Sequence, residues 1–306
     1  MPNSKTLNTK RDFDVIIKGR SLWADAGHRL MRNKMAVVGM SILGFIILLS
    51  VIAPYLQMIS PDLFPFTFDE VDWDNISTDP SFENHHYFGT DGNGRDLFIR
   101  TLYGGRISIM VGFVATLVSL VIGVTYGATA GFLGGKTDSF MMRFVDVLYS
   151  LPFMFFVIIL MVFFGRNIFL IFIALGAVEW LDMARIVRGQ TLSIKKKEFV
   201  EAAHAQGVST YNILKRHIIP NTLGPVAVYI TLTIPRVIMI ESFLSFLGLG
   251  VQEPMASWGV LISEGSPEIE TAWWRLIFPA IFLAFSLFSL NFIGDGIRDA
   301  LDPKDR

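Results

Sequence analysis

Long apolar stretches separated by short polar segments make up most of the chain. Six of them approach or exceed the roughly 20 residues that a helix needs to cross a bilayer. Since the bilayer interior offers no hydrogen-bond partners, the backbone groups of each stretch must bond within the segment, as they do in a helix. The pattern predicts an all-α polytopic membrane protein with six transmembrane helices, at about residues 36–56, 107–133, 147–164, 168–187, 223–247 and 276–293.

The second apolar stretch carries glycines at a spacing near four residues: Gly112, Gly123, Gly127 and Gly131. Small residues at this spacing lie on one side of a helix and let another backbone come close. We expect this helix to pack tightly against a neighbour.

Lysine and arginine residues are distributed unevenly between the polar segments. Twenty of them lie in 1–35, 135–146, 185–219 and 295–306, and four lie in 57–106, 165–167 and 251–273. Positively charged loops stay in the cytoplasm. Both termini are therefore predicted to be cytoplasmic, and the loop before the second span is predicted to be periplasmic.

These assignments divide the chain into five parts. They are a basic cytoplasmic segment at 1–35, a first transmembrane helix at 36–56, a periplasmic loop at 57–106, a five-helix core at 107–294 and a cytoplasmic tail at 295–306. Within the first part, residues 21–31 suit an amphipathic helix at the membrane surface and a solvated leader equally well.

Composition excludes several classes of protein. With 52% hydrophobic and 17% charged residues, the chain does not resemble a soluble domain. The absence of cysteine excludes disulfides, iron–sulfur clusters and thiolate zinc sites. His85 and His86 lack further ligands in a metal-binding pattern, so we expect a surface pair and no metal site. We also expect no cofactor and no nucleic acid partner.

Residues 134–137 match a phosphate-binding loop only in part. Gly134-Gly135-Lys136-Thr137 ends like a phosphate-binding loop, but Ala130 stands where the first glycine belongs, and the segment follows a membrane helix instead of a strand. No cluster of catalytic residues is evident either. The chain is therefore predicted not to be an enzyme and to have no nucleotide site of its own.

The most distinctive polar segment is residues 197–221. Glu198 to Gln206 is predicted to form one short helix, with Phe199, Ala202, Ala203 and Gln206 on one stripe. Gly207 follows at a position that favours a positive φ, and Ser209 is a candidate N-cap for a second helix over 210–217. Pro220 is expected to end that second helix.

The spacing in this segment resembles the EAA loop of ABC importer permeases, which reads Glu-Ala-Ala, three residues, Gly, nine residues, Ile-x-Leu-Pro. This chain has Glu201-Ala202-Ala203, then Gly207, then His217-Ile218-Ile219-Pro220. His217 and Ile219 depart from the pattern, and the ending resembles the peptide-importing branch. The resemblance implies a coupling loop at 188–221 that docks on an ATPase through Glu201, Ala202, Ala203, Gly207 and Pro220. An ordinary amphipathic loop is the alternative.

A second resemblance precedes the second span. Gly89-Thr90-Asp91, two residues, then Gly94-Arg95-Asp96 is similar to the entry of the permease core in dipeptide, oligopeptide and nickel importers. Its glycines suit tight turns, and Asp96 is a candidate cap for the next helix. We favour a structural turn over a contact with a binding protein.

Arg236 and Glu241 are predicted to lie at membrane depth within the fifth span. Ionisable groups there usually face a bundle interior or a watery path. We hypothesise that they belong to the translocation path, and that Glu241 meets a peptide's amino terminus; a polar contact to a partner subunit is an equal alternative. Asp182 is expected to pair with Arg185 or Arg188 on its own helix.

Taken over nearly the whole chain, the resemblance is to the permeases of dipeptide, oligopeptide and nickel importers, nearest to the C-type permeases for oligopeptides. It implies a type I importer (MetI-like) bundle in the bacterial inner membrane. It also implies a homologous B-type permease, two cytoplasmic ATPases, a periplasmic or lipid-anchored peptide-binding protein and a peptide substrate. Dipeptides, murein peptides and nickel are the alternative substrates.

Overall fold

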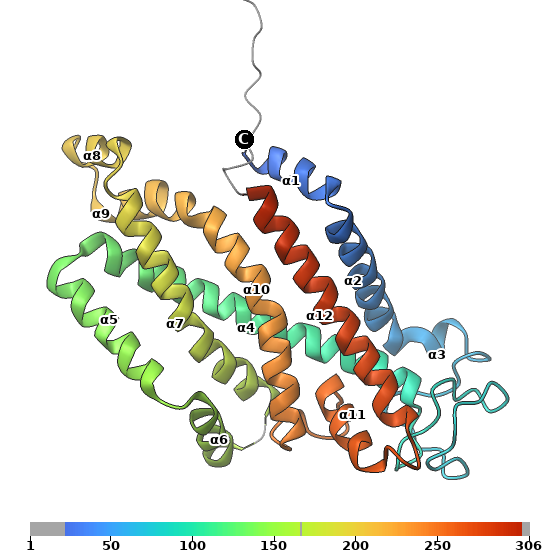
Figure 1. The fold of residues 1–306 in the computed structure, drawn as a ribbon. Coiled ribbons are helices and arrows are strands. Elements are labelled where there is room, and N and C mark those ends of the chain that lie inside the picture. Colours follow the sequence, from blue (N-terminus) through green and yellow to red (C-terminus); the bar gives the residue numbers. More distant parts are fainter. Residues whose placement is uncertain (1–21, 166, 302–306) are drawn as a thin grey trace, which may run out of the picture.

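The computed structural model describes residues 22–165 and 167–301, and the regular structure within these ranges is helical apart from two isolated bridges between extended residues. The predicted leader before residue 22 and the end of the tail lie outside the described residues. The helices (Figure 1) are α1 Leu22–Arg32, α2 Lys34–Ile52, α3 Leu56–Ile59, α4 Leu97–Leu133, α5 Gly135–Ser150, α6 Phe153–Phe164, α7 Ile168–Ile194, α8 Glu198–Ala205, α9 Thr210–Ile213, α10 Ile219–Phe246, α11 Trp258–Gly265 and α12 Trp274–Leu301.

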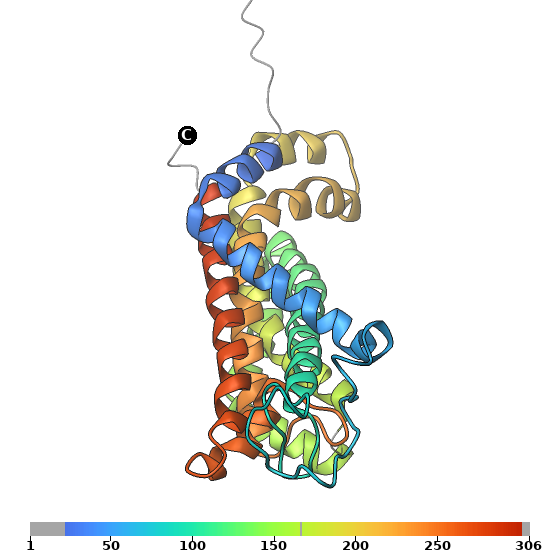
Figure 2. The ribbon, with the colours of Figure 1, turned by 90° about the vertical axis from the view of Figure 1, so that its right-hand side faces the viewer.

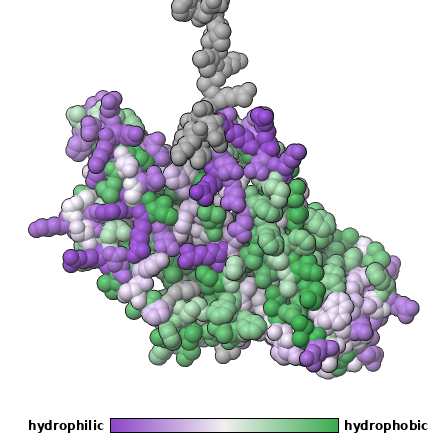
Figure 3. All heavy atoms as spheres, viewed as in Figure 1, coloured by the Kyte–Doolittle hydropathy of each residue, from purple (hydrophilic) through white to green (hydrophobic). Residues whose placement is uncertain are grey.

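Four helical segments among the described residues are long and apolar enough to cross a membrane: Lys34–Ile59, Leu97–Leu133, Thr210–Phe246 and Trp274–Leu301. Hydrophobic side chains cover α2 and α12 between two more hydrophilic ends (Figure 3). The bent pair α5–α6 makes a fifth span if it is counted as one. Within residues 22–165 and 167–301 the protein is thus an all-α membrane protein with four or five apolar spans, and the six-helix count is not confirmed.

The predicted span over 147–164 is wrong as a single helix, because α5 ends at Ser150 and an 81° bend separates it from α6. The cause is Pro152. A residue before proline avoids the helical region, and Leu151 accordingly has ψ 131°. Pro152 itself lies at the N-cap of α6 with ψ 109°. Hydropathy is continuous across this point, so the apolar pattern alone did not reveal the break.

A glycine seam joins α4 to α7, and we define it as Gly123, Gly127 and Gly131. A Cβ atom at Gly127 would overlap the carbonyl oxygen of Ala184 on α7, and one at Gly123 would overlap the Met183 side chain. At Gly131 it would meet the Arg188 carbonyl and the side chain of Thr191. The expected tight packing is confirmed, and the seam fixes the position of α7.

The polar segment before α4 folds at the end of the bundle opposite α8 and α9 (Figures 1 and 2). Asp96 caps α4 by accepting the Ile99 N–H at 2.8 Å, as predicted. Arg95 binds Asp91 at 2.8 Å and Glu253 at 3.0 Å, which ties this segment to the loop before α11. Gly89 and Gly94 have positive φ angles of 75° and 79°. This buried, cross-linked arrangement favours the structural interpretation of the motif.

His86 is fully buried, so the expectation of a surface histidine pair is wrong for this residue. Its Nδ1 lies 2.9 Å from Asp96 and its Nε2 lies 3.3 Å from Asp72. Burial opposes a charged ring, but hydrogen bonds from the ring to the two carboxylates and their negative charge outweigh it and raise the pKa of His86. The His86 ring therefore connects the polar segment to the start of α4.

Replacing Gly127 by alanine should push α4 away from α7. We expect overpacking of this kind to lower the free energy of unfolding by about 1–3 kcal/mol, seen as a lower Tm of the purified protein in detergent. Gly44→Ala on α2 is the matched control, because a Cβ atom at Gly44 meets nothing within 4 Å. Equal Tm values for the two variants would contradict the seam.

The contribution of His86 to stability should depend on pH. A raised pKa means that the stabilisation is fully present below the ordinary histidine pKa of 6.5 and is lost as pH rises through the higher folded value. His86→Gln should therefore destabilise the protein by about 1.5–3 kcal/mol at pH 6 and by clearly less at pH 9. Thermal unfolding at both pH values measures this.

His85→Gln is the control, because the Nδ1 atom of His85 is buried without a hydrogen-bond partner. A penalty for His86→Gln that stays constant from pH 6 to pH 9 would show that the ring is held as a neutral group.

Candidate functional site

The segment α8–α9 projects from one end of the helix bundle (Figure 1). The helix α8 ends in a Schellman motif, in which the Val208 N–H donates to the Ala203 carbonyl at 3.1 Å and the Gly207 N–H donates to His204 at 3.0 Å. Gly207 has φ 77°, as predicted. The motif turns the chain sharply and presents α8 as a separate short helix.

One face of α8 is held by the bundle and the other is open. Val200 and Ala203 are buried in a cluster that includes Met183 and Val187 of α7. The predicted stripe mostly faces the opposite way: Ala202 and Gln206 are exposed, and Phe199 is 44% exposed. Exposed residues near the turn include Glu201, Ala205, Ser209 and Tyr211. The open face therefore combines small, acidic and aromatic side chains.

Pro220 does not end the second short helix, and this prediction is wrong. The helix α9 passes into a π-helical turn over Leu214–Ile218 and then into α10, where Pro220 lies in the first turn. Proline is tolerated there because the first N–H groups of a helix have no partner within it. Ser209 holds the N-cap position of α9, but its side chain accepts no capping hydrogen bond.

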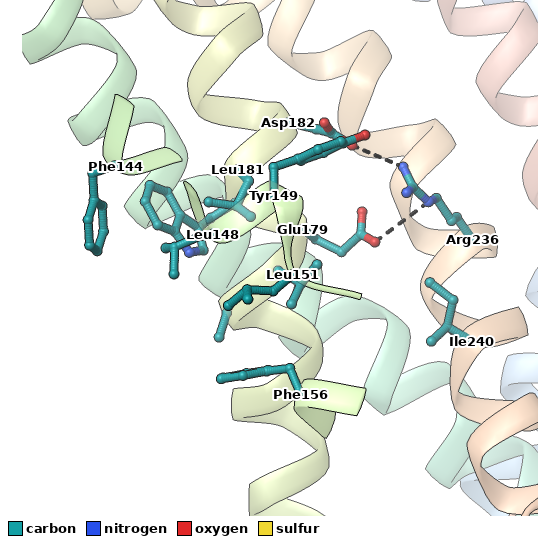
Figure 4. A pocket seen from close by; sticks show the side chains of 13 residues that line it. Phe144, Leu148, Tyr149, Leu151, Phe156, Glu179, Leu181, Asp182, Arg236 and Ile240 are labelled. Carbon is teal, nitrogen blue, oxygen red and sulfur yellow. Dashed lines mark hydrogen bonds and ion pairs between the residues drawn. The ribbon is translucent and has the colours of Figure 1, made fainter. Parts of the chain in front are cut away.

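Arg236 on α10 faces α7. Its Nη1 lies 3.2 Å from Asp182 and its Nε lies 3.6 Å from Glu179 (Figure 4). The three side chains line a cavity of about 450 Å³ between α5, α6, α7 and α10. The side chains of Arg236 and Glu241 are not brought together, and each binds different partners.

The expected pairing of Asp182 within its own helix is also wrong. Arg185 pairs with Asp146 at 2.8 Å, and Arg188 forms a bidentate pair with Asp138. Both of these aspartates lie on α5, which packs beside α7. Because Arg185 and Arg188 pair with the two carboxylates of α5, Asp182 pairs with Arg236 instead.

Glu241 is completely buried where α4, α10 and α11 meet. Its carboxylate accepts hydrogen bonds from Ser245 at 2.7 Å and from Ser108 at 3.2 Å. The Ser108 hydroxyl in turn accepts a hydrogen bond from the backbone N–H of Trp258 at 3.2 Å. No sequence signal indicated Ser108, which lies 133 positions before Glu241. In this structure the carboxylate joins three helices and does not face the cavity.

Comparisons with known proteins agree with this architecture. A family described as the inner membrane component of binding-protein-dependent transport systems matches residues 123–306, and the N-terminal TM domain of oligopeptide transport permease C matches residues 21–80. The oligopeptide transport system permease protein OppC of Haemophilus influenzae is 58% identical over 293 residues, covering 96% of this chain and 92% of that protein. The dipeptide transport system permease protein DppC of Bacillus subtilis is 47% identical over 283 residues, covering 92% and 86%.

Among solved structures, an inward-facing form of the MetNI methionine ABC transporter aligns with a TM-score of 0.55 and 18% identity, covering 67% of this chain and 96% of that one. At this identity the likeness shows the fold alone, and it agrees with the predicted MetI-like bundle. The family matches and the close relatives together show that the chain belongs to the inner membrane permeases of binding-protein-dependent ABC importers, among the oligopeptide permeases.

Proposed function

We propose that the chain is one of two permease subunits of an ATP-driven oligopeptide importer. Its homologous B-type partner would complete the translocation path, two cytoplasmic ATPases would drive it, and a periplasmic or lipid-anchored binding protein would deliver the peptide. The observation that carries this proposal is the projecting α8–α9 segment, whose open face offers a docking surface of the kind that the EAA resemblance implies.

In this proposal both termini and the α8–α9 segment face the cytoplasm. The protein has six membrane spans, which are the four apolar segments, the bent pair α5–α6 counted as one, and α7. The charged residues of α7 support its inclusion, because each of Glu179, Asp182, Arg185 and Arg188 is paired with a side chain of a neighbouring helix. Paired charges inside a bundle are compatible with membrane depth.

The coupling role rests on Glu201, Ala202, Ala203, Gly207 and Pro220. Ala202 presents almost no side chain on the open face, so an ATPase groove can approach the helix closely. Glu201 offers that groove a charged contact, while Ala203 anchors α8 to the bundle. Gly207 makes the turn, and Pro220 lies where the π-turn passes into α10. Movement of the ATPases would therefore reach α10 directly along the chain.

Arg236 and Glu241 stay our candidates for residues that shape the path. Arg236 lines an open cavity, and its side chain is 53% exposed. Glu241 would meet a passing peptide only after α10 separates from α4 and α11, since all three helices now enclose it. A role in holding the closed arrangement fits its present contacts.

Dipeptides are the second candidate substrate, because a dipeptide permease is also nearly half identical to this chain. Murein peptides and nickel remain further alternatives. Uptake of labelled di-, tri- and pentapeptides and of nickel, in a strain lacking only this gene, separates these cases. Loss of tri- and pentapeptide uptake alone would support oligopeptides as the substrate. Loss of dipeptide or nickel uptake would instead identify that compound as the substrate. If no uptake is lost, the proposal that the chain belongs to an importer is contradicted.

Gly207→Arg should reduce peptide uptake at least about tenfold while the protein still inserts into the membrane. A side chain at positive φ costs roughly 1–2 kcal/mol, and the arginine also alters the docking surface. Gly207→Asn is the matched variant, since asparagine tolerates this conformation, and it should retain most uptake. If the arginine variant is present in the membrane in the same amount as the unmodified protein and its uptake is near normal, the coupling role of Gly207 is contradicted.

Glu241→Gln should slow uptake by about tenfold without preventing assembly, because an amide accepts hydrogen bonds from Ser245 and Ser108 less strongly than a carboxylate. Uptake rates and co-purification of the partner subunits measure the two effects separately. Glu270→Gln, which changes an exposed glutamate, is the control. If both variants transport at the wild-type rate, Glu241 has no part in the transport cycle.

A further inference from the structure

The cavity between α5, α6, α7 and α10 has two unlike walls (Figure 4). One wall is apolar and aromatic, and the other carries the three charged side chains already described. The apolar wall includes Phe144, Leu148, Leu151 and Phe156. A volume of about 450 Å³ lies within the usual range for small-ligand sites and accommodates a few amino-acid residues.

The charged wall carries one more acidic side chain than basic side chain. Glu179 and Asp182 contribute two carboxylates, whereas Arg236 contributes one guanidinium. In surroundings that are otherwise apolar, this excess favours a ligand that brings a positive charge. Asp182 is the accessible carboxylate, with its side chain 24% exposed, while that of Glu179 is only 3% exposed.

Glu179 also has unused hydrogen-bonding capacity. Its Oε2 atom is buried without a hydrogen-bond partner, and its Oε1 atom lies at a long 3.6 Å from Arg236. Arginine binds a carboxylate best through two parallel N–H donors. A small shift of the guanidinium would let Arg236 use both oxygens of Glu179, and Asp182 would then be free for another cation.

We propose that this cavity binds the primary ammonium group of a transported peptide at Asp182, with the adjoining apolar side chains of the peptide against the aromatic wall. Arg236 moves fully to Glu179 when the ammonium enters, so no buried carboxylate is left unpaired. The inference rests on the proposed function, because it names the part of a peptide substrate that this chain recognises. It also assigns the recognition to Asp182, with Glu179 holding Arg236, and not to Glu241.

The test uses the absence of cysteine from the chain. A single cysteine introduced by Leu151→Cys lies at the cavity, where the side chain of Leu151 is 50% exposed. Its rate of reaction with a small maleimide is measured in membrane vesicles that hold the assembled transporter, without ATP. Ser139→Cys, on an exposed position of α5 outside the cavity, is the labelling control.

Three peptides serve as probes: trialanine, N-acetyl-trialanine and N-acetyl-lysyl-alanyl-alanine. Trialanine should slow labelling at Leu151→Cys and not at Ser139→Cys, while N-acetyl-trialanine should protect neither site. Protection by the lysyl peptide would show that any primary ammonium is accepted, and its failure would assign recognition to the amino terminus. Equal protection by trialanine and N-acetyl-trialanine, or protection by neither, would overturn the proposal.

Asp182→Asn in the Leu151→Cys background should raise the trialanine concentration for half protection by about tenfold. Asp146→Asn is the matched control, since it removes a carboxylate paired with Arg185 outside the cavity. Unchanged protection in the Asp182 variant would overturn the assignment. If Asp182→Asn fails to assemble, the three probes on the parent variant still decide the question.

Trialanine uptake by cells with the unmodified chain is measured alongside. Absent uptake would contradict the proposed function itself. Normal uptake without ammonium-dependent protection at the cavity would contradict only the present inference.

Discussion

Backbone contact between α4 and α7 is the constraint on which the rest of the molecule depends. It exists because Gly123, Gly127 and Gly131 present no side chains to α7. The seam fixes the helix that carries Glu179 and Asp182 and that continues toward α8. At its other end, α4 begins at the Asp96 cap within a buried charged network. The position of the cavity and the position of the projecting segment therefore both derive from one helix pair.

Features that depend on neighbouring residues were predictable, and features that depend on distant ones were not. Local conformation and residue spacing indicated the turn at Gly207, the cap at Asp96 and the close packing along the glycine seam. The pairing of Arg236 with Asp182 did not follow, since it depends on how α10 lies against α7. The break at Pro152 was missed because hydropathy counts apolar residues and ignores backbone angles. The role of Pro220 was missed because a π-turn has no sequence signature.

The arginine and the glutamate of α10 show how one helix meets two different surroundings. Arg236 and Glu241 are five positions apart, which places them about 140° apart around an ideal helix. The face with Glu241 is locked to α4 and α11 by serine hydroxyls and a tryptophan amide. The face with Arg236 borders the cavity, where a guanidinium lies between two carboxylates. One side of α10 is thus packed against its neighbours, and the other borders an open cavity.

The helical run from Thr210 to Phe246 has a mechanical consequence. Pro225 and Pro235 lie inside this run, and a proline within a helix removes a backbone hydrogen bond and kinks the helix. A displacement of α9 therefore reaches Arg236 only through both proline positions, and the run does not act as one rigid rod. Bending at the prolines absorbs part of the displacement before it reaches the ion pairs of Arg236 and the glycine seam.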